Sequence, residues 1–172
     1  MRKRLVVLAT FLLASIWSVV SSAYPNDSNI NNVNVQYTQL TKEARKQVDC
    51  LADNIYYEAG HEPMQGRFAV AMVTMNRTQD PRFPKDICSV VKQRVKSTCQ
   101  FSWYCEKKRL ANRDVYEQAR EVAVMVYANY EKIHDMTKGA LYYHADYVNP
   151  RWKLVKTTKI GRHIFYKEKG RQ

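Results

Sequence analysis

The densest group of residues with chemical potential is a short polar stretch around Glu58. Tyr56, Tyr57 and Glu58 close an apolar helical pattern, and Gly60 follows two residues after Glu58. A carboxyl group at such a place is partly removed from water, which disfavours its charged form and raises its pKa. A raised carboxyl pKa suits a general acid that protonates the leaving oxygen of a glycosidic bond. The alternative is that Glu58 caps the helix or pairs locally, as most surface glutamates do.

Glu62 lies four residues after Glu58, so a continuous helix would put both carboxylates on one face. Gly60 and Pro63 favour a break, after which Glu62 would open the next helix, where negative charge suits the helix dipole. Contact with a substrate is the second interpretation for Glu62. The metalloprotease motif H-E-x-x-H is absent, so we expect no metal and no cofactor.

A second patch is the string CQFSWYC, which spans residues 99–105. Gln100 and Ser102 can exchange hydrogen bonds with acetamido groups of a sugar. Trp103, like Tyr57, offers an aromatic face to a sugar ring, whereas we expect Phe101 to fill the core. The alternative is a purely structural role, in which Trp103 fills the core as well.

A third patch runs from Tyr142 to Trp152. His144 either orients a substrate or satisfies a buried partner, and the sequence favours neither. Tyr143, His144 and Trp152 are therefore candidate substrate contacts, and Asp146 is the best candidate for a second catalytic carboxylate.

The chain has four cysteines, whose wide, irregular spacing and lack of a C-x-x-C pair argue against structural zinc. In an exported protein they predict two disulfides. We favour Cys99 with Cys105 and Cys50 with Cys88, while a bond between Cys88 and Cys99 stays open.

Periodicity predicts an α+β fold with a helical body and a small antiparallel sheet at the C-terminal end. We expect helices over about 41–59, 64–76, 87–95 and 112–130, an irregular loop over 97–106, and strands within 140–145 and 156–167. A turn at 159–162 would separate two of the strands, and no internal repeat is present.

The N-terminus predicts export. Three basic residues, an apolar run from Leu5 to Val20 and small residues up to Ala23 form the pattern of a signal peptide. An uncleaved membrane anchor is the alternative, although the run is short for a spanning helix. We expect a signal peptide over 1–23, a flexible linker over 24–40 and one catalytic domain over 41–172.

The formal net charge of +12 falls by three to +9 if residues 1–23 are removed. Such a charge attracts a polyanion, namely nucleic acid, anionic lipid or the acidic polymers of a cell wall. Charge alone does not choose among them. Export argues against nucleic acid, and we expect a periplasmic or cell-envelope monomer that touches membrane only through an uncleaved N-terminal segment.

The chain resembles the SleB-type cell wall hydrolases, which include spore-cortex-lytic enzymes. Four strings carry the resemblance in family order over about residues 50–152: ADNIYYEAGHEPMQGRFAVAMVTMNR, FPKDICSVVKQ, CQFSWYC and GALYYHADYVNPRW. The family usually has Arg-Gly-Glu after the Glu-Ala pair, whereas this chain has Gly60-His61-Glu62, which leaves the local turn uncertain. Gly66-Arg67 also departs from the more usual Gly-Gln.

The resemblance implies a lysozyme-related fold and cleavage of peptidoglycan glycan strands between N-acetylmuramic acid and N-acetylglucosamine. It places the catalytic glutamate of the Y-x-E-A motif at Glu58. Because no partner carboxylate stands at an obvious spacing, we favour lytic transglycosylation, with Glu58 as both acid and base. The alternatives are a hydrolytic muramidase, a non-catalytic wall-binding module and a cationic membrane-active lysin.

Overall fold

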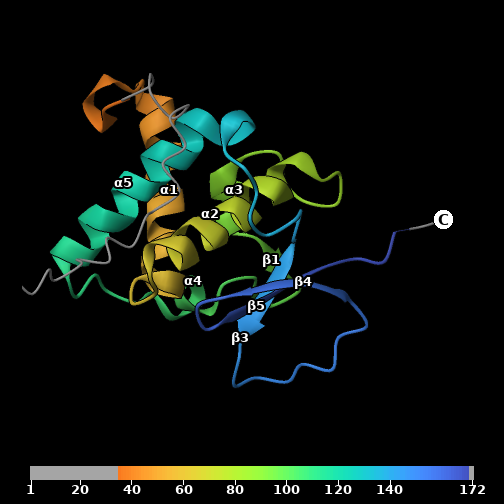
Figure 1. The fold of residues 1–172 in the computed structure, drawn as a ribbon. Helices are drawn as coiled ribbons and strands as arrows, with labels where there is room; N and C mark the ends of the chain where they lie inside the picture. Colours follow the sequence, from red (N-terminus) through yellow and green to blue (C-terminus); the bar gives the residue numbers. More distant parts are fainter. Residues whose placement is uncertain (1–34, 171–172) are drawn as a thin grey trace, which may run out of the picture. The chain divides into compact units, whose positions relative to one another are not determined.

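The computed structural model describes residues 35–170, which belong to one folding unit. Its helices form a body beside a small sheet (Figure 1). The expected signal peptide over 1–23 lies outside the described residues, as does most of the expected linker. Residues 37–39 of that linker form a short 3-10 helix, η1 (Tyr37–Gln39). The hydroxyl of Tyr37 donates to both carboxylate oxygens of Asp49 at 2.8 and 2.9 Å, so this end of the linker range packs on the helical body.

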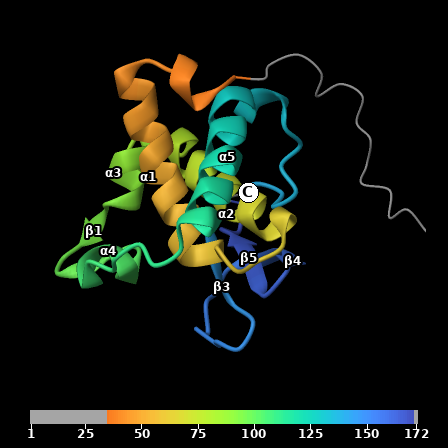
Figure 2. The same ribbon diagram turned by 90° about the vertical axis from the view of Figure 1, so that its left-hand side faces the viewer.

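The first long helix, α1 (Lys42–Ala59), confirms the predicted helix over 41–59. It begins at Thr41, whose hydroxyl accepts a hydrogen bond from the Ala44 N–H at 3.2 Å and so satisfies one free donor of the first turn. Its apolar stripe is buried against α5 (Arg113–Asn129), which begins at the cap Asn112. Figure 2 shows α1 and α5 side by side.

The second helix, α2 (Met64–Gln79), is buried along most of its length, as its nearly continuous apolar sequence predicts. Its last turn anchors the chain that leads into the sheet. The side-chain amide of Asn76 donates to the Ala140 carbonyl at 3.1 Å and to Asp135 at 2.9 Å. Arg77 Nε donates to the Leu141 carbonyl at 2.8 Å. These bonds fix the entry to the first strand of the sheet.

The third predicted helix is shorter than expected. Helix α3 (Ile87–Val91) ends four residues before Val95, because residues 94–95 instead form strand β1 (Arg94–Val95). That strand pairs with β2 (Thr98–Cys99). The segment expected to be an irregular loop over 97–106 therefore contains the second strand of this hairpin and a short helix, α4 (Ser102–Glu106). After α5 the chain makes one further 3-10 turn, η2 (Tyr130–Lys132).

The expected C-terminal sheet is present and is antiparallel. It consists of β3 (Tyr142–Ala145), β4 (Val155–Ile160) and β5 (His163–Lys167), in the order β3-β5-β4. Gly161, at φ +55°, forms the tight turn between β4 and β5. The α+β fold class predicted from the sequence is thus confirmed, and β3 stands next to the C-terminal end of α1 (Figures 1 and 2).

Both favoured disulfides are formed. Cys50 bonds to Cys88 and links α1 to α3, and Cys99 bonds to Cys105 and closes the loop that carries α4. Within residues 35–170, no helix is long and apolar enough to cross a membrane.

Candidate active site

Glu58 is the next-to-last residue of α1, and its side chain is partly buried beneath β3. The hydroxyl of Tyr143 on β3 donates to Glu58 Oε2 at 3.2 Å. The helix ends close to α5 because Gly60 has no side chain: a Cβ there would lie 3.1 Å from Val115 Cγ1 and 2.5 Å from the Tyr56 carbonyl oxygen. The carboxyl group therefore has a fixed position between a helix end and a strand.

Opposing influences act on the pKa of Glu58. Burial is the largest and raises the pKa, because removal from water penalises the charged form. The hydrogen bond from Tyr143 and the positive charges of Arg77 and Lys108 lower it, but the net pKa stays above the ordinary value. Glu58 therefore holds its proton to a higher pH than an exposed glutamate does, as a general acid requires.

Tyr143 remains a hydrogen-bond donor to Glu58. Burial and the nearby charge of Glu58 raise the pKa of the Tyr143 hydroxyl well above its ordinary value, so the hydroxyl keeps its proton. The ring packs edge-on to His163, with ring centroids 5.2 Å apart, and also contacts Phe165. We predicted Tyr143 as a substrate contact; the structure brings it to the carboxyl group itself, where it holds one oxygen.

Arg77 supplies a buried positive charge near this pair, a role that the sequence did not predict. Only 2% of the residue is exposed, and the guanidinium carbon lies 5.1 Å from the ring centroid of Phe83 and 5.4 Å from that of Phe101. Among the described residues, no carboxylate lies within ion-pair distance of it. Burial lowers the pKa of Arg77 below its ordinary value, and the charge of Glu58 acts in the opposite direction, so the two charges influence each other. The signal that could have identified Arg77 is a lone arginine at the end of an apolar helix.

The two tyrosines before Glu58 hold a loop at the edge of the site. Tyr57 donates its hydroxyl hydrogen to the Lys108 carbonyl at 2.8 Å. The hydroxyl oxygen of Tyr56 accepts from the N–H groups of Ala111 and Asn112, each at 3.0 Å. The chain from 108 to 112 is thus tied to the same helical turn that carries Glu58.

The ring of Tyr57 stacks on Trp103, with centroids 4.6 Å apart and planes 20° apart. Trp103 is only 8% exposed and Phe101 only 4%, so both belong to the core, as expected for Phe101. Trp103 still borders a hollow of about 210 Å³, lined by Asp53, Tyr57, Trp103, Tyr104, Lys107 and Lys108. Gln100 is partly buried, and Ser102 is exposed as the first residue of α4. Their contact with substrate stays a prediction.

His144 is held by the protein on both ring nitrogens. Nδ1 lies 2.8 Å from the Ala145 carbonyl and Nε2 lies 2.9 Å from the Tyr166 hydroxyl. A carbonyl only accepts, so in the neutral ring Nδ1 donates and Nε2 accepts. Trp152 stands edge-on to this ring and is 42% exposed. The arrangement favours the interpretation that His144 satisfies a partner within the protein, and contact of His144 and Trp152 with substrate stays a prediction.

Glu62 joins the N-terminal end of α2 to the β4–β5 hairpin. Its Oε2 accepts from the Arg162 N–H at 3.0 Å. The fit is tight, because a Cβ on Gly161 would lie 2.0 Å from the same oxygen. These contacts favour the structural interpretation of Glu62, and its contact with substrate stays a prediction.

Asp146 was the best candidate for a second carboxylate. Its carboxylate is 2.9 Å from Lys159 Nζ and 3.8 Å from Arg162 Nε, and the hydrogen bond from Lys159 holds its pKa below the ordinary value. Within the described part of the chain, no carboxylate, Asp146 included, shifts the pKa of Glu58. Residues 35–170 also contain no group of three or more His, Cys, Asp or Glu side chains placed to hold a metal.

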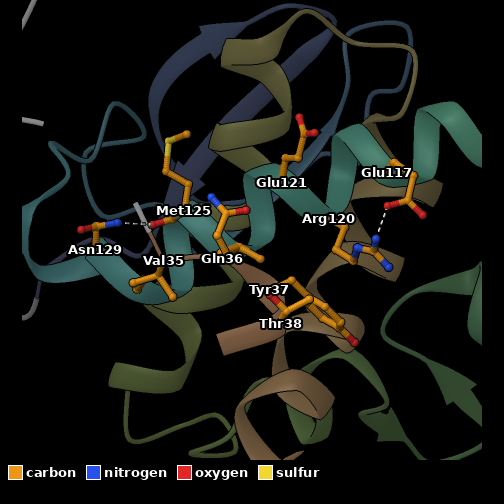
Figure 3. A pocket seen from close by; sticks show the side chains of 11 residues that line it. Val35, Gln36, Tyr37, Thr38, Glu117, Arg120, Glu121, Met125 and Asn129 are labelled. Atoms are coloured by element: carbon orange, nitrogen blue, oxygen red, sulfur yellow. Dashed lines mark hydrogen bonds and ion pairs between the residues drawn. The ribbon is translucent and has the colours of Figure 1, made fainter. Parts of the chain in front are cut away.

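A larger hollow of about 500 Å³ lies elsewhere, between the segment around η1 and the outer face of α5 (Figure 3). Tyr37 and Thr38 line one side, and Arg120 and Met125 lie on the other. It contains none of the predicted site residues.

Comparison with known proteins agrees with the fold and the resemblance. Residues 61–166 match the family model described as Cell Wall Hydrolase, a range that begins three residues after Glu58. The chain is 30% identical over 122 residues to the spore cortex-lytic enzyme of Bacillus subtilis (strain 168), which covers 67% of this chain and 35% of that protein. It is 28% identical over 125 residues to the spore cortex-lytic enzyme of Halalkalibacterium halodurans, covering 69% and 34%. The chain therefore spans about a third of the length of these relatives.

Two solved structures have the same fold. One is the catalytic domain of the germination-specific lytic transglycosylase SleB from Bacillus anthracis, at a TM-score of 0.57 and 26% identity, covering 72% of this chain and 95% of that one. The other is the catalytic domain of the Bacillus cereus SleB protein, at a TM-score of 0.58 and 24% identity, covering 79% and 98%. The family match covers more than half of the chain, so this protein belongs to the cell wall hydrolase family.

Proposed function

We propose that this protein is an exported enzyme that cuts peptidoglycan glycan strands between N-acetylmuramic acid and N-acetylglucosamine. The observation that carries the proposal is the environment of Glu58: a partly buried carboxyl group with a raised pKa, held on one oxygen by Tyr143. Family membership and the names of the relatives support a cell-wall substrate.

The proposed reaction is lytic transglycosylation. Glu58 donates its proton to the glycosidic oxygen as the bond to C1 of the muramic acid breaks. The 6-hydroxyl of the same sugar then bonds to C1 and returns its proton to Glu58, which leaves a 1,6-anhydro end and consumes no water. One carboxyl group suffices for both transfers, whereas hydrolysis by the usual routes needs a second carboxylate. The engagement of Asp146 by Lys159 supports the single-carboxylate route.

Digestion of purified sacculi tests the reaction, with product masses as the readout. Glu58→Gln should abolish release of glycan fragments, and the intact enzyme should yield anhydro ends that are one water lighter than reducing ends. Asp146→Asn should keep most of the activity. Reducing ends as the sole product, together with an inactive Asp146→Asn variant, would establish a hydrolytic muramidase instead.

The same variant separates the other classes of function. A wall-binding module would sediment with sacculi and release no fragments, with or without Glu58. A membrane-active lysin would lyse cells after Glu58→Gln and leave bare sacculi intact.

For localisation we propose the periplasm or cell envelope, reached through cleavage after Ala23. The mass of the exported protein would reveal an uncleaved N-terminus, and light scattering would test the proposed monomer.

A further inference from the structure

The loop that the two tyrosines hold is strongly basic. Residues 107–113, here called the basic loop, contain Lys107, Lys108, Arg109 and Arg113 and no acidic residue. All seven residues are exposed. Among the described ion pairs, the loop takes part in one, between Lys108 and Glu106 at 3.2 Å. Most of its positive charge is therefore available to a ligand.

The basic loop has a fixed place relative to Glu58. The hydroxyls of Tyr56 and Tyr57 bond to its backbone at Lys108, Ala111 and Asn112, and both tyrosines directly precede Glu58 on α1. The charge of Lys108 acts on Glu58. A strand bound at Glu58 therefore passes within reach of these cations.

Next to the loop lies the hollow of about 210 Å³ that Lys107 and Lys108 border. The rings of Tyr57, Trp103 and Tyr104 form its apolar wall, and Asp53 adds a carboxyl group. Such a lining offers positive charge for a carboxylate, negative charge for an ammonium group and ring surface for carbon atoms. A polymer with phosphate charge alone would gain nothing from Asp53.

From these features we infer that the basic loop and its hollow bind the stem peptides of the glycan strand, through the free carboxylates of those peptides. The inference rests on the proposed function and adds a substrate preference: strands that carry acidic peptides are cut in preference to strands whose peptide charges are masked. The inference also assigns a partner to part of the net positive charge. Export argued against nucleic acid but did not distinguish anionic lipid from the acidic polymers of a cell wall.

The test compares two soluble substrates, peptide-bearing glycan strands and the same strands after conversion of their carboxylates to amides. The variant is Lys107→Gln with Lys108→Gln. At low salt its KM for native strands should rise about five-fold, because two exposed charge contacts are lost. On amidated strands the variant and the parent enzyme should have the same KM. Each enzyme is assayed at its own pH optimum, because Lys108 also influences Glu58.

The matched control is Lys42→Gln with Lys46→Gln, which removes two exposed charges at the opposite end of α1 and should change neither KM. Sedimentation with the strands, measured in a Glu58→Gln background, reports binding without catalysis. An equal loss on both substrates, or no loss on native strands, overturns the inference. So does lysine-dependent binding to vesicles of anionic phospholipid in place of strands. If native strands bind through the lysines but are not cut, the proposed function fails and the binding site stands.

Discussion

At the scale of single residues, Glu58 is poised by interactions that oppose one another. Burial favours its protonated form, while the hydroxyl of Tyr143 and the charge of Arg77 favour its ionised form. The proposed reaction needs both forms in turn, first as an acid and then as a base. Tyr143 holds Oε2, so in the proposed reaction Oε1 is the oxygen that would meet the substrate.

Tyr143→Phe should keep the ring in the core and remove the hydrogen bond. A donor to a carboxylate lowers the carboxyl pKa, so loss of this donor raises the pKa of Glu58 further. The first step requires protonated Glu58, and kcat/KM falls as the pH rises through that pKa. We therefore expect the alkaline limb of the pH profile of kcat/KM to move to higher pH, and kcat to fall by about tenfold as Glu58 loses its fixed orientation.

The neighbouring Tyr142 provides a control, because its hydroxyl donates to Glu168 at 3.0 Å, on the exposed side of the strand. Tyr142→Phe should leave the alkaline limb in place. An unchanged limb in Tyr143→Phe as well would show that the hydroxyl does not tune Glu58.

At the scale of elements, the site depends on how the β4–β5 hairpin docks onto the start of α2. Gly161 lies at φ +55° and against Glu62, whereas Gly139 lies at φ +75° in open space, where an added Cβ would meet no atom within 4 Å. Both glycines have a left-handed backbone conformation, and Gly161 is in addition crowded by the Glu62 side chain.

Gly161→Ala should therefore destabilise the protein more than Gly139→Ala does. Both changes cost about 1 kcal/mol for a left-handed alanine, and Gly161→Ala must also displace the Glu62 carboxylate from the Arg162 N–H. We expect an additional loss of about 1–3 kcal/mol in the free energy of unfolding, measured by urea denaturation. Addition of Glu62→Ala should recover part of that loss. Equal costs at the two glycines would mean that the docking contributes little.

The sequence predicted the elements with strong periodicity and missed the short elements between residues 94 and 106. Helix α1 and its cap Thr41 follow from local spacing, and so does the turn at Gly161. Helix α4 and the β1–β2 hairpin are held by the disulfide between Cys99 and Cys105 and by pairing across a short turn, which no apolar repeat reveals.

In the candidate site, too, the sequence identified one residue and missed its partners. Glu58 is visible as a carboxyl group at the end of an apolar helix. Its partners Tyr143 and Arg77 stand 85 and 19 residues away in the sequence, and Arg77 on α2 fixes the chain at Leu141, just before β3. Contacts of this kind depend on how elements pack, so residue type alone assigned Tyr143 to the substrate.

At the scale of the whole molecule, the seam between α1 and α5 contains acidic groups as well as apolar ones. Asp53 is partly buried there, with Asp49 one turn before it on α1 and Tyr116 on α5. Burial, followed by the charge of Asp49, raises the pKa of Asp53 to about 6, although a hydrogen bond with Tyr116 and the charge of Lys92 act in the other direction. The fold thus contains a carboxyl group that keeps its proton to a higher pH than an exposed aspartate does.

Stability should consequently fall as the pH rises past this group. The folded-state pKa lies above the ordinary value of 3.8, so the folded protein binds the proton more tightly than the unfolded chain. The stabilisation is complete below about pH 4 and is lost as the pH rises through about 6, by an amount on the order of 2 kcal/mol, since solvent screens part of the effect.

Asp53→Asn removes this titration. We expect the variant to be more stable than the parent at about pH 7 and similar to it at about pH 4, in urea denaturation across that range. Glu121→Gln, which neutralises an exposed carboxyl group on α5, should show no such dependence. A stability difference for Asp53→Asn that is constant with pH, or larger in acid, would show that Asp53 ionises in the seam at little cost.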